Sequence, residues 1–309
     1  MNSTNDIEKN YQAQEQNIIH MAGDKEEKFF HIKNEDCVAH AIVAEPLKYL
    51  DPFLDPSKTW LTVGDYNGFE AHYLLQQGQN VVASDLSDAV LRKAQAEGLI
   101  KDFSKQNVER LTYDDNSFDY VMCKEAFHHF PRAYLGLYEM IRVSKTATIL
   151  LTEPLDILSR MSLLVLIKNI ADKINPLLIN RIWKNRFSYE TVGNYVFKIS
   201  EREIEKIAMG MGLPFVAFKR YNMFKSHVPL PGMYDIPANA SLLRTIRRKM
   251  AIRDLASMLG ILPHGTLCCV LFKESPSESL LKELRRQSFI LLPLPVNPYL
   301  GKCGLRSSL

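Results

Sequence analysis

Between residues 60 and 152 the hydrophobic positions follow two spacings in turn. Short apolar runs, typical of strands buried on both faces, occupy 60–63, 80–85, 118–124 and 146–152. The segments between the first two and the last two runs carry apolar residues at intervals of three and four, as on one face of a helix. With a polar third strand region near 107 and two later apolar runs, at 213–222 and 265–274, the pattern predicts an α/β fold. We expect a doubly wound, mostly parallel, seven-stranded sheet.

The rest of the chain does not follow this alternation of strands and helices, and the breaks divide the sequence into segments. Residues 1–36 form a polar arm with few apolar anchors, Tyr11 and Ile18 among them, and are either a lid or a disordered tail. Residues 37–154 form the core. A long helical segment at 155–199 is either a cap inserted after the fifth strand or an ordinary packing helix. Residues 200–274 complete the sheet, with a basic helical excursion at 226–263, and 275–309 form a C-terminal tail with a helix and an irregular, proline-bearing end.

Composition and charge narrow the class of protein. The 309 residues are 46% hydrophobic, enough for a large core, and the net charge is only +3, which does not favour a nucleic-acid partner. The five cysteines show no CxxC spacing, so we expect neither a zinc site nor a disulfide framework. The polar start has no apolar signal region and no run reaches the length of a membrane span, so we expect a cytoplasmic protein.

The first apolar run leads into the candidate chemistry. Trp60–Val63 breaks at Gly64 into a turn, and Gly68 begins the next helix. Such a turn presents backbone N–H groups and a helix N-terminus at the sheet edge, where a nucleotide-like ligand can bind. Asp85 ends the second strand about 20 residues later, the spacing at which a carboxylate meets ribose hydroxyls. Any adenosine-containing ligand would fit this arrangement.

The residues that follow favour one family. The stretches WLTVGD–GFEAHYL, SDLS, NSFDYVMCKEAFHHF and YEMIRVSK together resemble the class I S-adenosylmethionine-dependent methyltransferases, which have a Rossmann-like sheet. The resemblance runs from about residue 60 to residue 154 and is weaker in the last strand pair. The VGD turn and the KEAFHHFPR loop resemble the branch found beside glycan-biosynthesis enzymes.

The resemblance implies roles for individual residues. It implies that glycines of the turn approach the methionine part of S-adenosylmethionine, that Asp85 binds the ribose, and that Asn107 with the Val108 backbone faces the adenine. Thr62 stands where the family usually has an acid, which Asp65 could replace, and Tyr66 stands where a further glycine is usual. The implied cofactor-binding set is Gly64, Asp65, Tyr66, Gly68, Asp85, Leu86, Asn107, Val108 and Lys124.

The loop after the fourth strand carries the candidate catalytic residues. Lys124 and Glu125 would close the pocket near the sulfonium, and His128 or His129 could take the proton of an alcohol acceptor. Because the two histidines are adjacent, only one is expected to face the acceptor, and both could instead be structural. The resemblance implies O-methylation of a sugar or another small polar or lipid-linked acceptor. The alternatives are a nicotinamide-dependent oxidoreductase and a non-catalytic, methyltransferase-like partner subunit.

One dense basic cluster lies outside the resemblance. Within 241–259, five cations alternate with apolar residues at helical spacing. This helix could be a solvated face, a phosphate contact for the acceptor or a peripheral membrane contact. No sequence feature indicates the oligomeric state.

Overall fold

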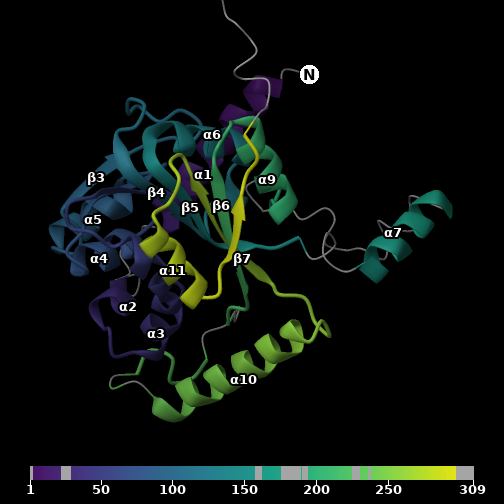
Figure 1. Ribbon diagram of the computed structural model, residues 1–309. Helices are drawn as coiled ribbons and strands as arrows, with labels where there is room; N and C mark the ends of the chain where they lie inside the picture. Colours follow the sequence, from purple (N-terminus) through teal and green to yellow (C-terminus); the bar gives the residue numbers. More distant parts are fainter. Residues whose placement is uncertain are drawn as a thin grey trace, which may run out of the picture.

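An eight-stranded sheet forms the centre of the protein (Figure 1). The computed structural model describes residues 3–21, 29–156, 162–174, 189, 194–224, 230–235, 237 and 239–296. The strand order is β3-β2-β1-β4-β5-β7-β6-β8. The strands are β1 (Thr59–Val63), β2 (Asn80–Asp85), β3 (Asp102–Lys105), β4 (Phe118–Lys124), β5 (Ser144–Pro154), β6 (Phe215–Tyr221), β7 (Thr266–Phe272) and β8 (Ile290–Pro293).

The direction of the strands confirms a mostly parallel sheet. The pairs β2–β3, β1–β2, β1–β4 and β4–β5 are parallel, whereas β7 is antiparallel to both β5 and β6. The predicted count of seven strands is wrong, because the tail adds β8 antiparallel to β6. The run Ile290–Pro293 is short and ends at a proline, which cannot donate a ladder hydrogen bond. It lies at the sheet edge, where a missing ladder bond is tolerated.

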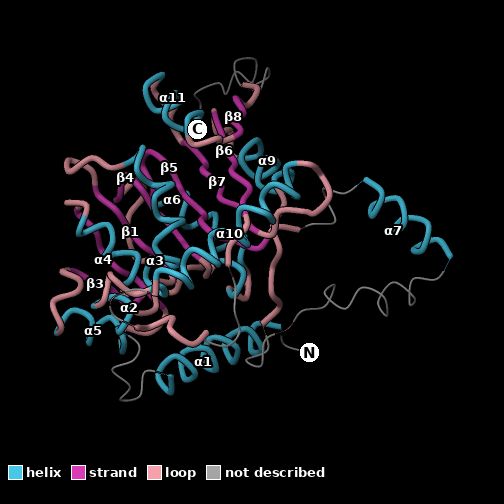
Figure 2. Tube along the Cα trace, turned by 90° about the horizontal axis from the view of Figure 1, so that it is seen from below, coloured by secondary structure: helices cyan, strands magenta, loops and turns pink. Residues whose placement is uncertain are grey.

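Helices cover both faces of the sheet, as Figures 1 and 2 show. One apolar cluster joins α4 (Phe69–Gln76), α5 (Ala89–Ala96), α11 (Glu278–Arg286) and the 3-10 helix η2 (Glu45–Phe53) to the sheet. The other joins α6 (Ala133–Val143) and α9 (Glu201–Gly210) to its opposite face. Alternate residues of β4 divide between the two clusters, Tyr120 and Met122 in one and Val121 and Cys123 in the other. Such a strand, buried on both faces, is typical of a parallel sheet.

Several local predictions are confirmed. Gly78 and Gly98 follow α4 and α5 with left-handed φ values of 74° and 72°, and Gly68 is the N-cap of α4. Ser200 and Glu203 form the reciprocal capping box of α9. The third strand is β3, which ends just before the polar stretch at Asn107 by which its place was predicted.

Two helices lie outside the α/β layers. The basic excursion between β6 and β7 contains α10 (Ala240–Met258), in agreement with the predicted helix. Within the proposed cap, α7 (Ser162–Ile174) is a helix that presents exposed apolar side chains, while 157–161 and 175–188 lie outside the described residues. Two short helices, α2 (Phe30–Lys33) and α3 (Val38–Ala44), precede η2.

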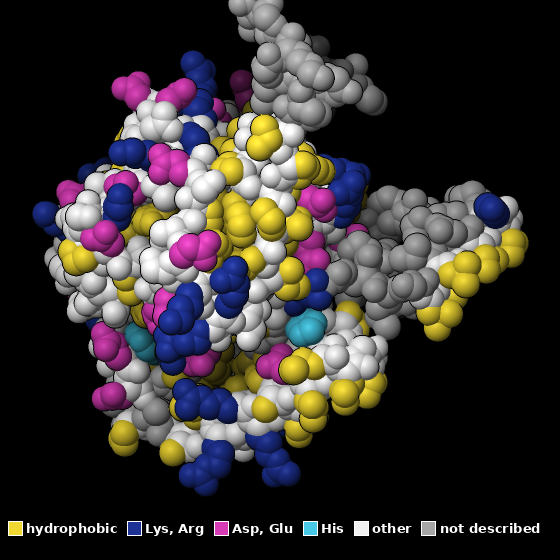
Figure 3. All heavy atoms as spheres, viewed as in Figure 1, with side chains coloured by type: hydrophobic (Ala, Val, Ile, Leu, Met, Phe, Trp, Pro, Cys, Tyr) yellow, Lys and Arg dark blue, Asp and Glu magenta, His cyan; other side chains and the backbone are white. Residues whose placement is uncertain are grey.

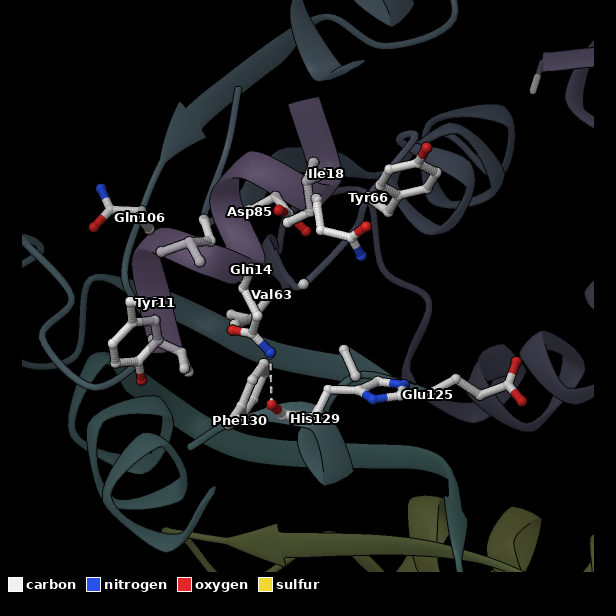
Figure 4. A pocket seen from close by; sticks show the side chains of 15 residues that line it. Tyr11, Gln14, Ile18, Val63, Tyr66, Asp85, Gln106, Glu125, His129 and Phe130 are labelled. Carbon is white, nitrogen blue, oxygen red and sulfur yellow. Dashed lines mark hydrogen bonds between the residues drawn. The ribbon is translucent and has the colours of Figure 1, made fainter. Parts of the chain in front are cut away.

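The N-terminal arm contains a long helix. α1 (Ser3–Met21) lies across the carboxyl-terminal ends of the central strands, as Figure 4 shows for its middle part. Gln14 Nε2 donates to the carbonyl of His129 at 2.8 Å, and Glu15 pairs with Lys105 at the end of β3. Of the two alternatives for the arm, a disordered tail is therefore wrong for residues 3–21, which form this helix.

Candidate active site

The turn after β1 brings the backbone close to the next strand. Gly64 has a φ of 70°, and a Cβ atom added there would lie 2.5 Å from the Cβ of Ala126. Only glycine combines this conformation with this approach. The turn closes through a hydrogen bond from the amide of Gly68 to the carbonyl of Asp65. As a result, the end of β1 and the loop after β4 form adjacent walls of one cavity.

Asp65 is a buried anchor of this turn and does not line the cavity. Thr62 Oγ1 donates to Asp65 Oδ2 at 2.7 Å, and the amides of Glu70 and Ala71 donate to the same carboxyl group. Burial, followed by the charge of Glu70 and a hydrogen bond with it, raises the pKa of Asp65 well above its ordinary value. Thr62 and Asp65 thus share the place where the family usually has one acid.

A buried ion pair extends from this anchor to β4. Lys124 Nζ lies 2.9 Å from Glu70 Oε1 and 3.5 Å from Glu125 Oε2. Burial favours the neutral form of Lys124, but the carboxylates of Glu70 and Glu125 outweigh it and raise its pKa. Burial would likewise raise the pKa of Glu70, yet Lys124 and hydrogen bonds lower it. Lys124 therefore contacts carboxylates behind the cavity wall and is not among the residues that line the cavity.

Asp85 ends β2 with its carboxyl group toward the cavity (Figure 4). It is 7% exposed, and Ser87 N donates to its Oδ1 at 3.2 Å. Burial raises the pKa of Asp85 to about 6, against the opposing effect of the Ser87 and Leu86 amides. The charge of Asp85 in turn adds to burial in raising the pKa of Tyr66 on the opposite side of the turn. This carboxylate is well placed to accept hydrogen bonds from a ligand.

The cavity itself has a volume of about 360 Å³ and lies between the ends of β1 and β4. In the sheet, β2 and β3 follow β1 on one side, whereas β4 and β5 lie on its other side, so the strand order reverses between β1 and β4. A crevice at such a reversal is the usual ligand site of an open α/β sheet. Figure 4 shows α1 passing over it. The lining residues are Tyr11, Gln14, Asn17, Ile18, Val63, Gly64, Tyr66, Asp85, Leu86, Gln106, Val108, Glu125, Ala126, His129 and Phe130.

Seven predicted site residues therefore lie together and five lie elsewhere. Gly64, Tyr66, Asp85, Leu86, Val108, Glu125 and His129 line the cavity. The other five, which support its walls, are Asp65, Gly68, Asn107, Lys124 and His128.

The two histidines have different surroundings. A hydrogen bond of 2.7 Å joins His128 Nδ1 to Glu153 Oε2, and Glu153 also accepts the amides of Ala126, Phe127 and His128. Glu153 is fully buried, so it fixes the loop after β4 from below. The ring of His129 lies 3.9 Å from that of His128 and faces the cavity. One histidine thus positions the loop while the other is presented to a ligand.

Backbone strain marks the ends of β4 and β5. Glu125 has a φ of 53° and Thr152 a φ of 64°, and the Glu125 amide donates to the carbonyl of Leu151 at 3.1 Å. Non-glycine residues in this region concentrate at functional sites. The hydroxyl of Tyr221, at the end of β6, donates to Thr152 Oγ1 at 2.8 Å.

A second cavity of about 280 Å³ begins on the other side of Tyr221. Its walls come from η2, the end of β6 and the inner face of α10, and they are mostly apolar with a few charged groups at the rim. Tyr49, Met223, Phe224, Ile246 and Met250 supply apolar surface, and the charged residues are Glu45, Arg247 and Asp254.

The sequence analysis missed the contribution of other elements to the first cavity. Gln106 follows β3 directly, and its backbone amide donates to the backbone carbonyl of Asp85 at 2.8 Å. No motif indicated this residue, because β3 is short and polar and its place was predicted only from the stretch at Asn107. Tyr11 and Ile18 were recognised as apolar anchors of the arm, but nothing in their spacing indicated what they would contact.

The described residues contain no group of three or more histidine, cysteine or acidic side chains that could hold a metal ion. Four cysteines, Cys37, Cys123, Cys268 and Cys269, are buried free thiols, and burial raises the pKa of Cys268 to about 12. Of the helices that the structure describes, none is both long and apolar enough to cross a membrane.

Comparison with solved structures returns methyltransferases at low similarity. A possible histamine N-methyltransferase of Thermotoga maritima is 13% identical, with 84% of this chain and 99% of that chain covered and a TM-score of 0.47. A protein of Bacillus halodurans described as a putative methyltransferase is 16% identical, covering 75% and 100% of the two chains with a TM-score of 0.42. Magnesium protoporphyrin IX methyltransferase of Synechocystis is 15% identical, covering 75% and 82% with a TM-score of 0.42.

The comparison of sequences is more specific. No curated protein matches the chain. A model of the methyltransferase domain family, however, matches residues 61–152. This range extends from β1 to β5 and includes the turn at Gly64, Asp85 and both histidines. Eleven of the fifteen residues that line the first cavity therefore lie in the segment that matches a methyltransferase domain, and the other four belong to α1.

Proposed function

We propose that this protein is an S-adenosylmethionine-dependent methyltransferase that transfers a methyl group to a hydroxyl of its acceptor. The observation that carries the proposal is the convergence of Gly64, Asp85 and His129 on one cavity within the segment that matches the methyltransferase domain. S-adenosylmethionine, when bound, supplies an electrophilic methyl group. The residues below supply binding, orientation and proton transfer.

The cavity fits the chemistry of an adenosine group. The buried carboxyl group of Asp85 accepts the backbone amides of Ser87 and Leu86 and still has a raised pKa, so hydroxyl donors from a ribose would stabilise its charged form. Ile18, Val108 and Phe130 supply apolar walls suited to a purine. Gly64 leaves room at the turn, and Glu125 adds a carboxylate that favours a cationic ligand.

His129 is the residue we assign as general base. Its ring faces the cavity, and an imidazole can accept the proton that an alcohol loses as its oxygen is methylated. His128, through Glu153, holds the loop in place, so that His129 is fixed before the acceptor binds. Under this assignment Lys124 positions Glu125 and Asp65 stabilises the turn, both without contact to the ligand.

The acceptor we propose is a sugar or another small polar molecule, or a lipid-linked one. The second cavity supports an acceptor with an apolar part, because Tyr221 lines it and also contacts Thr152 at the end of β5. We assign residues 1–36 to a lid and 155–199 to a cap over the acceptor side, and we expect a cytoplasmic location. Gln14 and Ile18 of α1, which line the first cavity, support the lid.

Calorimetric titration tests this proposal against its alternatives. We expect micromolar binding of S-adenosylmethionine and of its demethylated product, and no binding of nicotinamide cofactors. Exclusive binding of a nicotinamide cofactor would assign an oxidoreductase to the same sheet. Absence of binding by every compound would instead assign a non-catalytic partner subunit.

A further inference from the structure

The helix α10 has one side against the body of the protein and one side away from it. Ile246 and Ser257 are buried on the inner side, and Met250 and Asp254 line the second cavity there. At 100° per residue, the opposite side carries Arg244 and Arg248 in the first half of the helix and Ile252, Leu255 and Leu259 in the second.

The second half of this outer side and the residues after it expose large apolar side chains. We call them the α10 patch. Figure 3 shows apolar side chains along the lower edge of the molecule, where Figure 1 places α10, with basic side chains beside them. A group of this size on a soluble protein marks a contact with a partner or a membrane. The exposed fractions are 60% for Ile252, 58% for Leu255, 78% for Met258, 66% for Leu259, 65% for Ile261 and 46% for Leu262.

Charge distinguishes between the kinds of partner. α10 carries four arginines and one lysine against a single acid, Asp254, whose carboxylate accepts a hydrogen bond from Asn222 on the body side. Among the described residues, the ion pair found for the basic side chains of α10 is that of Arg247, which also lines the second cavity, with Glu45 of η2, at 3.8 Å. A second copy of the chain would bring two strongly basic helices together. An apolar patch with adjacent cations instead matches the acyl boundary and headgroups of an anionic bilayer.

The position of α10 in the fold gives this contact a direction. α10 lies in the connection between Tyr221, the last residue of β6, and Thr266, the first of β7, and these two residues are register partners. The helix therefore emerges at the same sheet edge as the candidate active site. We propose that α10 docks this protein on the surface of an anionic membrane, with the α10 patch in the acyl boundary and Arg244, Arg248 and Lys249 against the headgroups.

Co-sedimentation of the full chain with vesicles tests the proposal. We expect binding to vesicles of phosphatidylcholine with phosphatidylserine, weaker binding to phosphatidylcholine alone, and loss of binding as salt is added. The double variant Arg244→Ala, Arg248→Ala should weaken binding on the order of 20-fold, since each cation near an anionic surface contributes about fivefold. The double variant Leu255→Glu, Leu259→Glu should abolish it.

The control is Leu135→Glu on α6, which makes the same chemical change at a side chain that is 40% exposed outside the patch. It should bind vesicles like the unaltered protein, and all variants should keep its thermal unfolding midpoint. Equal binding by the Leu255→Glu, Leu259→Glu variant would overturn the proposal. Failure of the full chain to bind either kind of vesicle would also overturn the proposal. This holds whether light scattering then shows a monomer or a dimer that the Leu255→Glu, Leu259→Glu variant dissociates. None of these outcomes depends on the proposed methyltransferase activity.

Discussion

Replacing Asp85 with asparagine should make the free protein more stable and the cofactor complex weaker. The change keeps the shape of the side chain and removes its charge. In the free protein, burial raises the pKa of Asp85 from 3.8 to about 6. At 1.36 kcal/mol per pKa unit, this difference makes the charged carboxylate destabilising by about 3 kcal/mol at neutral pH.

The sign of the pH dependence follows from the same shift. Because the folded protein binds the proton of Asp85 more tightly than the unfolded chain does, the destabilisation is fully present above pH 6 and is relieved as the pH falls toward 3.8. Asp85→Asn should therefore raise the free energy of unfolding at pH 7 and have little effect near pH 4. Thermal unfolding of both proteins across this pH range measures the difference.

Cofactor binding should change in the opposite direction. Under the proposed function, ribose hydroxyls would donate to the charged carboxylate, and hydrogen bonds to a charged group contribute roughly 1.5–3 kcal/mol, so Asp85→Asn should raise the dissociation constant about 10- to 100-fold. With Asp85 intact, affinity should be constant above pH 6 and fall about tenfold per unit below it. Asp88→Asn, at the next acidic residue, is the control: it removes an exposed ion pair with Arg92, so it should leave affinity unchanged and lower stability by no more than about 1 kcal/mol. Unchanged affinity in Asp85→Asn would refute the ribose assignment.

Three further changes test other parts of the site. His129→Ala should lower turnover about 10²- to 10⁴-fold with cofactor affinity retained, while His128→Ala should mainly lower the unfolding temperature; equal turnover in His129→Ala and the unaltered enzyme would exclude a base at this position. Gly64→Ala should destabilise more than Gly78→Ala, because both positions have left-handed φ but only the first has an atom at 2.5 Å; equal unfolding free energies would contradict the packing argument. Gln14→Ala removes the hydrogen bond to the carbonyl of His129 and should weaken cofactor binding by about fivefold, the effect of one hydrogen bond, whereas Gln16→Ala, at an exposed position, should not. Equal cofactor affinities of the two variants in calorimetry would show that α1 does not contribute to the site.

The sequence predicted those parts of the fold that local patterns encode. Strands β1, β2, β4 and β5 are largely apolar runs, and turn glycines such as Gly78 have a left-handed φ that other residues adopt rarely, so both were recognised. β3 and β8 are short edge strands with mostly half-exposed or exposed side chains, and their pairing depends on a neighbour that no local pattern shows.

For the candidate site, the sequence predicted backbone positions better than the directions of side chains. Asp85 and Gly64 have positions that follow from strand and turn geometry, and both line the cavity. The family resemblance implied Lys124 at the ligand, and the position of the loop after β4 suggested His128, but each side chain points to a buried acid, Glu70 or Glu153. Such an acid lies far along the chain, so the direction of a loop side chain could not be predicted without the fold.

The hydrogen bond from Gln14 to the carbonyl of His129 has a kinetic consequence. Through it, the helix that covers the first cavity also holds the loop that bears the proposed base. Under the proposed function, exchange of the demethylated product for S-adenosylmethionine would require α1 to release this loop, so departure of the product and disengagement of the base would become one event. Turnover would then follow a compulsory order, with the cofactor first to enter and last to leave, and its rate would depend on solvent viscosity more than on the acidity of the acceptor.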